Sequence, residues 1–269
     1  MLSSPPPPES RSLQDVTGAV DYFVRVSEIV REIGVADDTL RAVELLEKAT
    51  LRMGAEVAVF ASFIRDDESC QSYRLLLACD PQWCMEYEQL AGFADDPWLN
   101  YARHHSEPVR ASEVEVGSPI QQSVVQLAQR FGFRSAVIVP APSSGGLSRL
   151  GVLCLGSSIA GYFEADGYVA FKVVARSVAM EFHEWWLARL KDDFVASSRL
   201  TAVDLALLAH EREGHSTKVI ARVLGATTGA IDTRFQRINA RLGVPNRKAA
   251  ARLAAEYGLI PTTKKSPPR

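Results

Sequence analysis

The segment from residue 215 to residue 250 constrains the fold most, because helical periodicity and turn glycines alternate within it. Apolar residues at three- and four-residue spacing predict a short helix over 217–224 and a longer helix after it. Gly225 stands where the first helix must end and the chain must adopt a positive φ. Thr227 and Thr228 can then cap the second helix. The apolar positions of that second helix are Ile231, Phe235, Ile238 and Leu242, and Gly243 ends it.

Two short helices that cross closely need particular residues at three places. The crossing point needs a small residue, which is Ala221; the turn needs a glycine, which is Gly225; and the core needs a branched apolar plug, which is Ile231. The segment therefore predicts a helix-turn-helix whose second helix presents a polar outer face to DNA. An ordinary helical hairpin with a solvated basic face is the alternative. The candidate DNA-binding residues are Lys218, Thr227, Thr228, Asp232, Thr233, Arg234, Arg237 and Arg241.

Charge is distributed unevenly along the chain. Residues 199–269 contain 13 Lys and Arg against 5 Asp and Glu, a net charge of +8. Since the whole chain carries −2, the first 198 residues carry −10. A basic C-terminal region on an acidic body is typical of a module that binds nucleic-acid phosphates.

The same segment resembles the C-terminal domain of LuxR-type transcriptional regulators, most specifically in its L-G-V-x-N-R run. The positions that match the family pattern are Gly214, Ser216, Ile220, Ala221, Leu224, Gly225, Leu242, Gly243, Val244, Asn246, Arg247 and Ala249. The departures from it are Val203, Ala206, Val219, Ala226 and Arg234. The resemblance implies an all-α, four-helix helix-turn-helix domain over residues 199–262, and the departures at 203 and 206 predict a weaker ion network inside it.

A chain of 269 residues predicts two domains. In the first 190 residues, periodicity and turn residues predict an alternation of helices and strands, and hence a single sheet with helices on both faces. The expected helices are 16–33, 39–53, 81–90, 121–130 and 164–190, and the expected strands are 56–64, 73–79, 131–139 and 150–156. The expected fold is α+β: an α/β/α sandwich of the GAF or PAS type over 16–190, a linker over 191–198, the helical domain, and disordered tails over 1–15 and 263–269.

Two helix faces carry specific expectations. In the first helix, Val20, Phe23, Val24, Ser27 and Val30 recur at helical spacing and are expected to pack inward. The long helix over 164–190 carries a continuous apolar stripe, part of which should pack on the sheet while the remainder forms a dimer seam. The stripe consists of Tyr168, Phe171, Ala175, Val178, Phe182 and Trp185, with Trp186 beside it.

Trp83, Tyr87 and Asp96 stand at the spacing found in the autoinducer-binding domain of LuxR-type proteins. The resemblance implies that the Trp83 indole donates to a lactone carbonyl, that Asp96 accepts from a ligand amide, and that Tyr87 lines the pocket. Alternatively, these residues are structural and Asp96 caps the helix that follows it. Three further pocket positions depart from the family pattern, namely Cys79, Ala111 and Ala136. The ligand of such a pocket would be an acyl-homoserine lactone or another small amphipathic signalling molecule.

The expected function is therefore transcription control of quorum-sensing or virulence genes by a cytoplasmic homodimer that binds promoter DNA. The diverged pocket predicts weak or absent binding of acyl-homoserine lactones. Two alternatives remain open. One is a transcription factor that is a ligand-dependent acyl-homoserine-lactone receptor, and the other is a domain that senses a protein partner and is fused to a DNA-binding module. An enzyme is a rival class, since His104 and His105 lie near Asp95 and Asp96, but no catalytic motif accompanies them. The acidic pair of a response-regulator receiver is also missing.

The four cysteines, Cys70, Cys79, Cys84 and Cys154, show no metal-binding spacing. Free thiols in a reducing compartment are expected, and the sequence predicts no metal site, no catalytic residue and no resident cofactor. The Pro-rich start lacks the apolar core of an export signal, and no stretch is long and apolar enough to span a membrane.

Overall fold

The computed structural model describes residues 12–64, 72–90, 92–143, 149–257 and 259–260. The chain divides into two compact units, one made of Met1–Pro142 with Leu150–Trp185, the other of Trp186–Arg269 with Ser143–Arg149. The first unit is mixed α and β, and the described residues from 186 onward in the second form only helices as regular elements. Expectations for the tails at 1–11 and 263–269, and for the loop at 144–148, lie outside the described residues.

The first unit is built on a five-stranded sheet in the order β2-β1-β5-β4-β3. The pairs β1–β2, β3–β4 and β4–β5 are antiparallel. The strands are β1 (Val57–Ile64), β2 (Arg74–Ala78), β3 (Val109–Arg110), β4 (Ser135–Pro142) and β5 (Arg149–Ser157). The sequence missed β3, because two residues are too short to show an alternating pattern.

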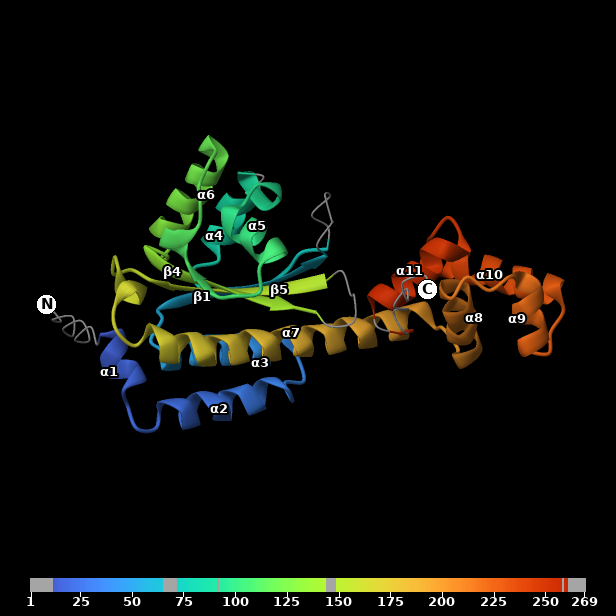
Figure 1. Cartoon of the computed structure of the whole chain (residues 1–269), viewed down its shortest axis with the longest axis horizontal. Helices are drawn as coiled ribbons and strands as arrows, with labels where there is room; N and C mark the ends of the chain where they lie inside the picture. Colours follow the sequence, from blue (N-terminus) through green and yellow to red (C-terminus); the bar gives the residue numbers. More distant parts are fainter. Residues whose placement is uncertain (1–11, 65–71, 91, 144–148, 258, 261–269) are drawn as a thin grey trace, which may run out of the picture. The chain divides into compact units, whose positions relative to one another are not determined.

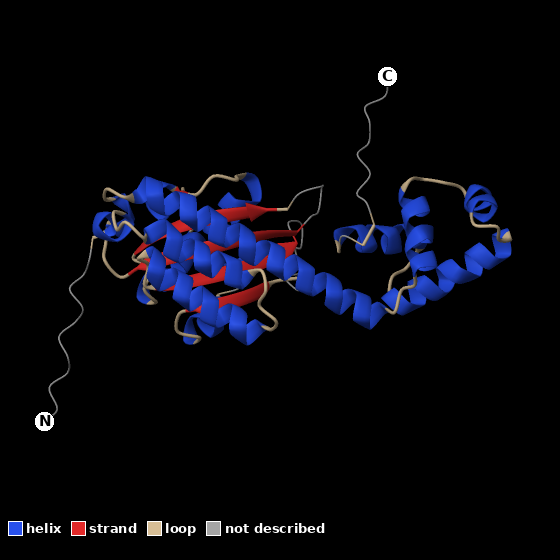
Figure 2. Cartoon of the chain, turned by 90° about the horizontal axis from the view of Figure 1, so that it is seen from below, coloured by secondary structure: helices blue, strands red, loops and turns tan. Residues whose placement is uncertain are grey.

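Helices cover both faces of this sheet (Figures 1 and 2). On one face lie α3 and α7 with α2 outside them, and on the other lie α4, α5 and α6. The helices of this unit are α1 (Leu13–Thr17), α2 (Tyr22–Ile33), α3 (Thr39–Met53), α4 (Gln82–Gln89), α5 (Pro97–His104), α6 (Pro119–Arg130) and the first part of α7 (Tyr168–Ser198), with 3-10 turns at Gly92–Ala94, Ala111–Glu113 and Tyr162–Glu164.

Because both faces are covered, β1 is buried almost throughout rather than on alternate residues. Its side chains still alternate between the two faces. Phe60 packs toward α7, with its ring centroid 5.7 Å from that of Phe182. Val59 and Phe63 belong instead to the core beneath α4, α5 and α6, which holds the candidate ligand site.

The first predicted helix is corrected by the structure. The chain forms two helices there, because it breaks between Thr17 and Tyr22, and α1 begins inside the tail that was expected to be disordered up to residue 15. The predicted inward face of this helix is also wrong, because Val20, Phe23 and Val24 are exposed. The residues that α2 buries are Tyr22, Val26, Ile29 and Ile33.

The apolar stripe on α7 is confirmed as a buried face, with Phe171, Ala175, Val178 and Phe182 fully buried. The end of this helix was predicted too early. It continues through 191–198 to Ser198, so the segment expected to be a linker is helical. Strand β4 begins four residues later than expected, because Phe131–Arg134 turns the chain out of α6, with Gly132 at φ 96°.

The second unit contains α8 (Ala202–Arg212), α9 (Thr217–Val223), α10 (Thr228–Leu242) and α11 (Arg247–Glu256). The bounds of α9 and α10 agree with the periodicity to within one residue. Gly225 and Gly243 adopt the positive φ values of 62° and 65° that their places at helix ends require. The Thr227 hydroxyl caps α10 by accepting a hydrogen bond from the Ala230 N–H at 3.2 Å.

Small residues allow these helices to pack closely. Ala221 on α9 is buried beside Ile231, Phe235 and Ile238 of α10. The buried side of α11 consists of alanines, namely Ala250, Ala251, Ala254 and Ala255. This packing fixes which side of α10 faces inward and leaves the opposite side exposed.

Candidate functional site

The core beneath α4, α5 and α6 encloses a small cavity lined by aromatic side chains and one carboxylate. Its volume is about 30 Å³, and its wall includes Trp83, Tyr87, Asp96, Trp98 and Phe133. That volume holds about one water molecule, whereas ligand pockets usually measure about 300–1,000 Å³. The cavity therefore sits at the predicted ligand site but is nearly filled by protein side chains.

Asp96 is the polar centre of this cavity and the N-cap of α5. Its Oδ1 accepts hydrogen bonds from the N–H groups of Trp98 at 2.7 Å and Leu99 at 3.0 Å. Its Oδ2 accepts a hydrogen bond from the Tyr87 hydroxyl. Asp96 thus has the capping role that the structural alternative assigned to it, while it also faces the cavity.

Burial dominates the electrostatics of this pair. Desolvation raises the pKa of Asp96, and the hydrogen bonds from Tyr87, Leu99 and Trp98 lower it by less, so the net pKa lies above the ordinary value. Burial and the neighbouring Asp96 also raise the pKa of Tyr87 well above its ordinary value, which keeps the phenol protonated as a donor.

Trp83 stacks on Tyr87 with ring centroids 4.8 Å apart. Its indole N–H is buried and has no hydrogen-bond partner among the described residues, and the same holds for the N–H of Trp98. An unpaired buried donor costs about 1–3 kcal/mol. A carbonyl or hydroxyl oxygen in the cavity would accept hydrogen bonds from these N–H groups.

The structure brings together three of the six predicted ligand residues, Trp83, Tyr87 and Asp96. The other three pack in the surrounding core without lining the cavity. Cys79 and Ala111 are half-buried, and Ala136 is buried on β4. Burial raises the pKa of the Cys79 thiol to about 12, so Cys79 is a neutral side chain rather than a thiolate. Trp98 and Phe133 also line the cavity but were not among the predicted ligand residues.

The histidines that raised the possibility of an enzyme have structural partners. The Nδ1 atoms of His104 and His105 lie 2.9 and 3.0 Å from the carbonyl oxygens of Asn100 and Tyr101, one turn earlier in α5. Asp95 accepts hydrogen bonds from the side chains of Ser118 and Gln121.

The second candidate site is the outer face of α10 and the start of α9. Seven of its eight predicted residues are exposed, and Arg234 is half-buried. Two of the threonines are engaged within their own helix, Thr227 as the cap and Thr233 through a 2.9 Å bond to the Gly229 carbonyl. Arg237 is exposed and forms no hydrogen bond or ion pair among the described residues, so its guanidinium is available.

Arg234 has an internal role that the sequence did not reveal. Its Nε donates to Asp204 Oδ1 at 2.7 Å, and a terminal nitrogen donates to the Thr201 hydroxyl at 2.9 Å. Arg241 approaches the other Asp204 oxygen at 3.6 Å and donates to the Arg199 carbonyl at 2.9 Å. Arg234 and Asp204 thus supply an ion pair inside this unit that does not involve Val203 or Ala206.

Asp204 is the residue that sequence reasoning missed in this unit. It lies at the third position of α8 and forms a capping box with Thr201, and the T-x-x-D spacing is the signal that could have identified it. Desolvation raises the pKa of Asp204, but the hydrogen bonds from Arg234 and Thr201 and the charge of Arg234 outweigh that effect. The net pKa lies below the ordinary value.

The L-G-V-x-N-R run also has a structural explanation. Asn246 caps α11 by accepting a hydrogen bond from the Ala249 N–H at 2.9 Å. Arg247 connects three helices, since it pairs with Glu211 of α8 at 3.1 Å, donates to the Thr217 hydroxyl of α9 at 2.9 Å, and lies over the Phe235 ring of α10.

Solved structures share this arrangement of elements. SdiA in complex with octanoyl-rac-glycerol aligns with a TM-score of 0.70 at 16% identity, covering 89% of this chain and 97% of that one. Escherichia coli SdiA aligns with a TM-score of 0.70 at 15% identity, covering 91% and 100%. CepR2 from Burkholderia cenocepacia, an N-acylhomoserine-lactone-dependent LuxR family transcription factor, aligns with a TM-score of 0.53 at 16% identity, covering 63% and 98%. At such low identities these matches establish the fold.

The fold is thus an α/β unit followed in the chain by a helical unit. The autoinducer-binding domain family matches residues 38–176, just over half of the chain, and the protein belongs to that family. A search of curated proteins found no match. Among the helices that the structure describes, none combines the length and apolar character needed to cross a lipid bilayer.

Proposed function

We propose that this protein is a transcriptional regulator of the LuxR type. In this proposal the helical unit binds promoter DNA as one half of a homodimer, and the α/β unit carries a diverged autoinducer cavity. The regulated genes would be those of cell-density or virulence control. The protein would act in the cytoplasm.

The observation that carries the proposal is that α10 has a buried apolar side and an exposed basic side. Ile231, Phe235 and Ile238 are buried, while Arg237 on the opposite side is exposed and unpaired among the described residues. A surface groove of about 630 Å³ between α8 and α10 is lined by Arg234, Arg237 and Arg241. Exposed guanidinium groups along one helix suit contacts with base edges and phosphates.

DNA binding is tested with duplexes selected from a random pool by the full-length protein. Affinity should fall steeply with salt, because each neutralised phosphate releases about 0.9 counterion equivalents. A footprint should cover two half-sites about one helical turn apart. Salt-insensitive binding, or no selected sequence, would contradict the proposal.

Substitutions of single basic residues then show which side chains contact the DNA. Arg237→Ala should cost about 1–3 kcal/mol of binding free energy on the selected site or relax its base preference. Lys218→Ala should weaken binding to all sequences alike. Arg130→Ala removes the same charge from the α/β unit and is the matched control, with no expected effect. An Arg237→Ala protein that binds like the wild type would show that this face does not contact DNA.

A second candidate function is a ligand-dependent receptor, which the unpaired N–H groups of Trp83 and Trp98 favour. The small cavity opposes it, because a ligand would have to displace the side chains that fill the site. We therefore expect no thermal shift with acyl-homoserine lactones of any chain length.

The panel for that experiment also includes octanoyl glycerol, since SdiA has been crystallised with it. A rise of several degrees in Tm with any compound, abolished by Asp96→Asn, would establish the receptor function. In the absence of such a shift, DNA binding without added ligand supports the diverged-cavity proposal.

A further inference from the structure

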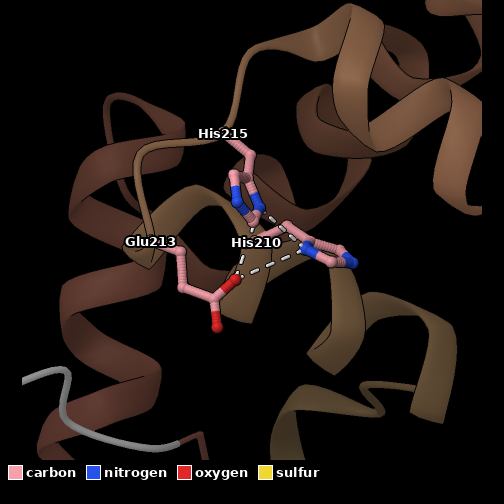
Figure 3. Close-up of side chains that lie close together, drawn as sticks. All are labelled: His210, Glu213 and His215. Carbon is pink, nitrogen blue, oxygen red and sulfur yellow. Dashed lines mark hydrogen bonds and ion pairs between the residues drawn. The ribbon is translucent and has the colours of Figure 1, made fainter.

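Three potential metal-ligand side chains converge at the C-terminal end of α8, outside both sites described above (Figure 3). The Nδ1 atoms of His210 and His215 lie 3.0 Å apart. Oε2 of Glu213 lies 3.6 Å from the first nitrogen and 3.3 Å from the second. The spacing H-x-x-E-x-H differs from the i, i+4 pair of a helical metal site, so no metal site could be predicted here from spacing alone.

The backbone fixes this arrangement. Glu213 is the C-cap of α8, and Gly214 reverses the chain with φ 78°. The His215 N–H then donates to the His210 carbonyl at 3.1 Å, and the Gly214 N–H donates to the Glu211 carbonyl at 3.0 Å. These bonds return His215 over His210, so the two rings are brought together by the turn itself.

The contact between the rings requires a lone pair at the centre of the cluster. Two imidazole nitrogens 3.0 Å apart share at most one proton, because two N–H groups would repel each other. At least one Nδ1 therefore presents a lone pair toward the other ring and the Glu213 carboxylate. That lone pair and the carboxylate oxygens are the atoms that a cation would bind.

The distances fit a tetrahedral ion. Zn²⁺ binds imidazole nitrogen and carboxylate oxygen at about 2.0–2.2 Å, so neighbouring ligand atoms of a tetrahedron are about 3.3–3.5 Å apart. The three observed separations, 3.0, 3.3 and 3.6 Å, bracket this range. Two imidazoles and one carboxylate are also a ligand set that Zn²⁺ uses with a fourth, open position.

The surroundings permit entry of an ion. All three side chains reach solvent, and a surface depression of about 450 Å³ lined by Gly214, His215 and Ser216 adjoins the cluster. Arg212, Arg247 and Lys248 also border this depression, and the charge of Arg247 is offset by its 3.1 Å pair with Glu211.

We propose that His210, Glu213 and His215 bind one Zn²⁺ ion, with the fourth position left to water or to an external ligand. The ion links the end of α8 to the residues just before α9 and stabilises the helical unit through preferential binding to the folded state. The three side chains are neither among the predicted DNA-binding residues nor in the lining of the aromatic cavity.

The test uses untagged, full-length protein stripped with chelator. Calorimetric titration should show one equivalent of Zn²⁺ bound with micromolar affinity. His210→Ala and His215→Ala should each weaken this binding at least tenfold, and so should Glu213→Gln, which preserves the side-chain shape. His104→Ala, which removes another exposed histidine, is the matched control and should bind like the wild type.

A second measurement tests whether the bound ion has tetrahedral coordination. Co²⁺ in place of Zn²⁺ should give the intense visible absorption of a tetrahedral complex in the wild type and in His104→Ala, and lose it in His215→Ala, with helical circular dichroism unchanged in all three. Zn²⁺ binding that survives both histidine substitutions, or no stoichiometric binding, would overturn the proposal.

Discussion

Each unit of this protein has a buried aspartate at the start of a helix, and the pKa values of the two carboxylates are shifted in opposite directions. Asp96 caps α5 inside an aromatic core, where its side-chain partner is the neutral Tyr87 hydroxyl. Asp204 completes the capping box of α8 and faces the guanidinium groups of Arg234 and Arg241.

The difference shows how environment decides the state of a carboxylate. Around Asp96 the loss of water outweighs the hydrogen bonds and raises its pKa. Around Asp204 the hydrogen bonds from Arg234 and Thr201, together with the charge of Arg234, outweigh the loss of water and lower its pKa. Asp96 is thus mainly a hydrogen-bond acceptor in a core, whereas Asp204 is one member of an ion network.

The largest effect is expected for Asp96→Ala. The substitution leaves the Tyr87 hydroxyl and two backbone N–H groups unpaired in a buried site, which should lower the free energy of unfolding by about 3–5 kcal/mol. The measurement is urea denaturation followed by tryptophan fluorescence, since all four tryptophans lie at positions 83, 98, 185 and 186. Asp95→Ala is the neighbouring control, because its partners Ser118 and Gln121 are near water, and a loss as large as that of Asp96→Ala would contradict this assignment.

Asparagine substitutions separate charge from shape at the two sites. Asp204→Asn removes the charge that pairs with two arginines and should cost about 1.5–3 kcal/mol. Asp96→Asn keeps an oxygen for the α5 cap in a site that already disfavours charge, and should cost less than about 1 kcal/mol. Hydrogen exchange of α8 and α10 peptides reports the first variant, and fluorescence-detected unfolding reports the second. If the two asparagine substitutions lowered the free energy of unfolding equally, the proposed difference between the two carboxylates would be wrong.

The pH dependence of these variants should have opposite signs. Because the folded pKa of Asp96 lies above its ordinary value of about 3.8, the wild type gains stability as pH falls through the folded pKa toward 3.8, and Asp96→Asn loses that gain. Because the folded pKa of Asp204 lies below about 3.8, its contribution is lost as pH falls below 3.8, and Asp204→Asn removes that loss.

The measured quantity for this prediction is the difference in unfolding free energy between variant and wild type at pH 7, 5, 4 and 3. It should grow on acidification for Asp96→Asn and shrink below about pH 4 for Asp204→Asn, by roughly 1.4 kcal/mol for each unit of pKa shift. Changes of the same sign in both variants would show that one of the two pKa directions is reversed.

The smallest effect concerns two arginines on one helix. Arg237→Ala should change the stability of the helical unit by less than about 0.5 kcal/mol, because its side chain is exposed and unpaired among the described residues. Arg234→Ala should cost about 0.5–1.5 kcal/mol, since its pair with Asp204 is partly exposed. Thermal unfolding monitored by circular dichroism separates them, and an Arg237→Ala protein that is the less stable of the two would reverse the roles assigned here.

The sequence by itself determined the elements whose signals are local. The bounds of α3, α9 and α10 follow from periodicity and terminal glycines, because a helix end requires a cap within a few residues. The buried stripe of α7 could be predicted in the same way, since its apolar residues recur at helical spacing over several turns.

Only the tertiary structure decided which polar groups meet. Tyr87 and Asp96 belong to different helices, as do Asp204 and Arg234, and neither pairing can be derived from periodicity. The inward face of α2 was decided by packing as well, since both of its sides carry apolar residues. The volume of the cavity and the meeting of His210 with His215 depend on side-chain positions a few ångströms apart, which spacing along the chain does not specify.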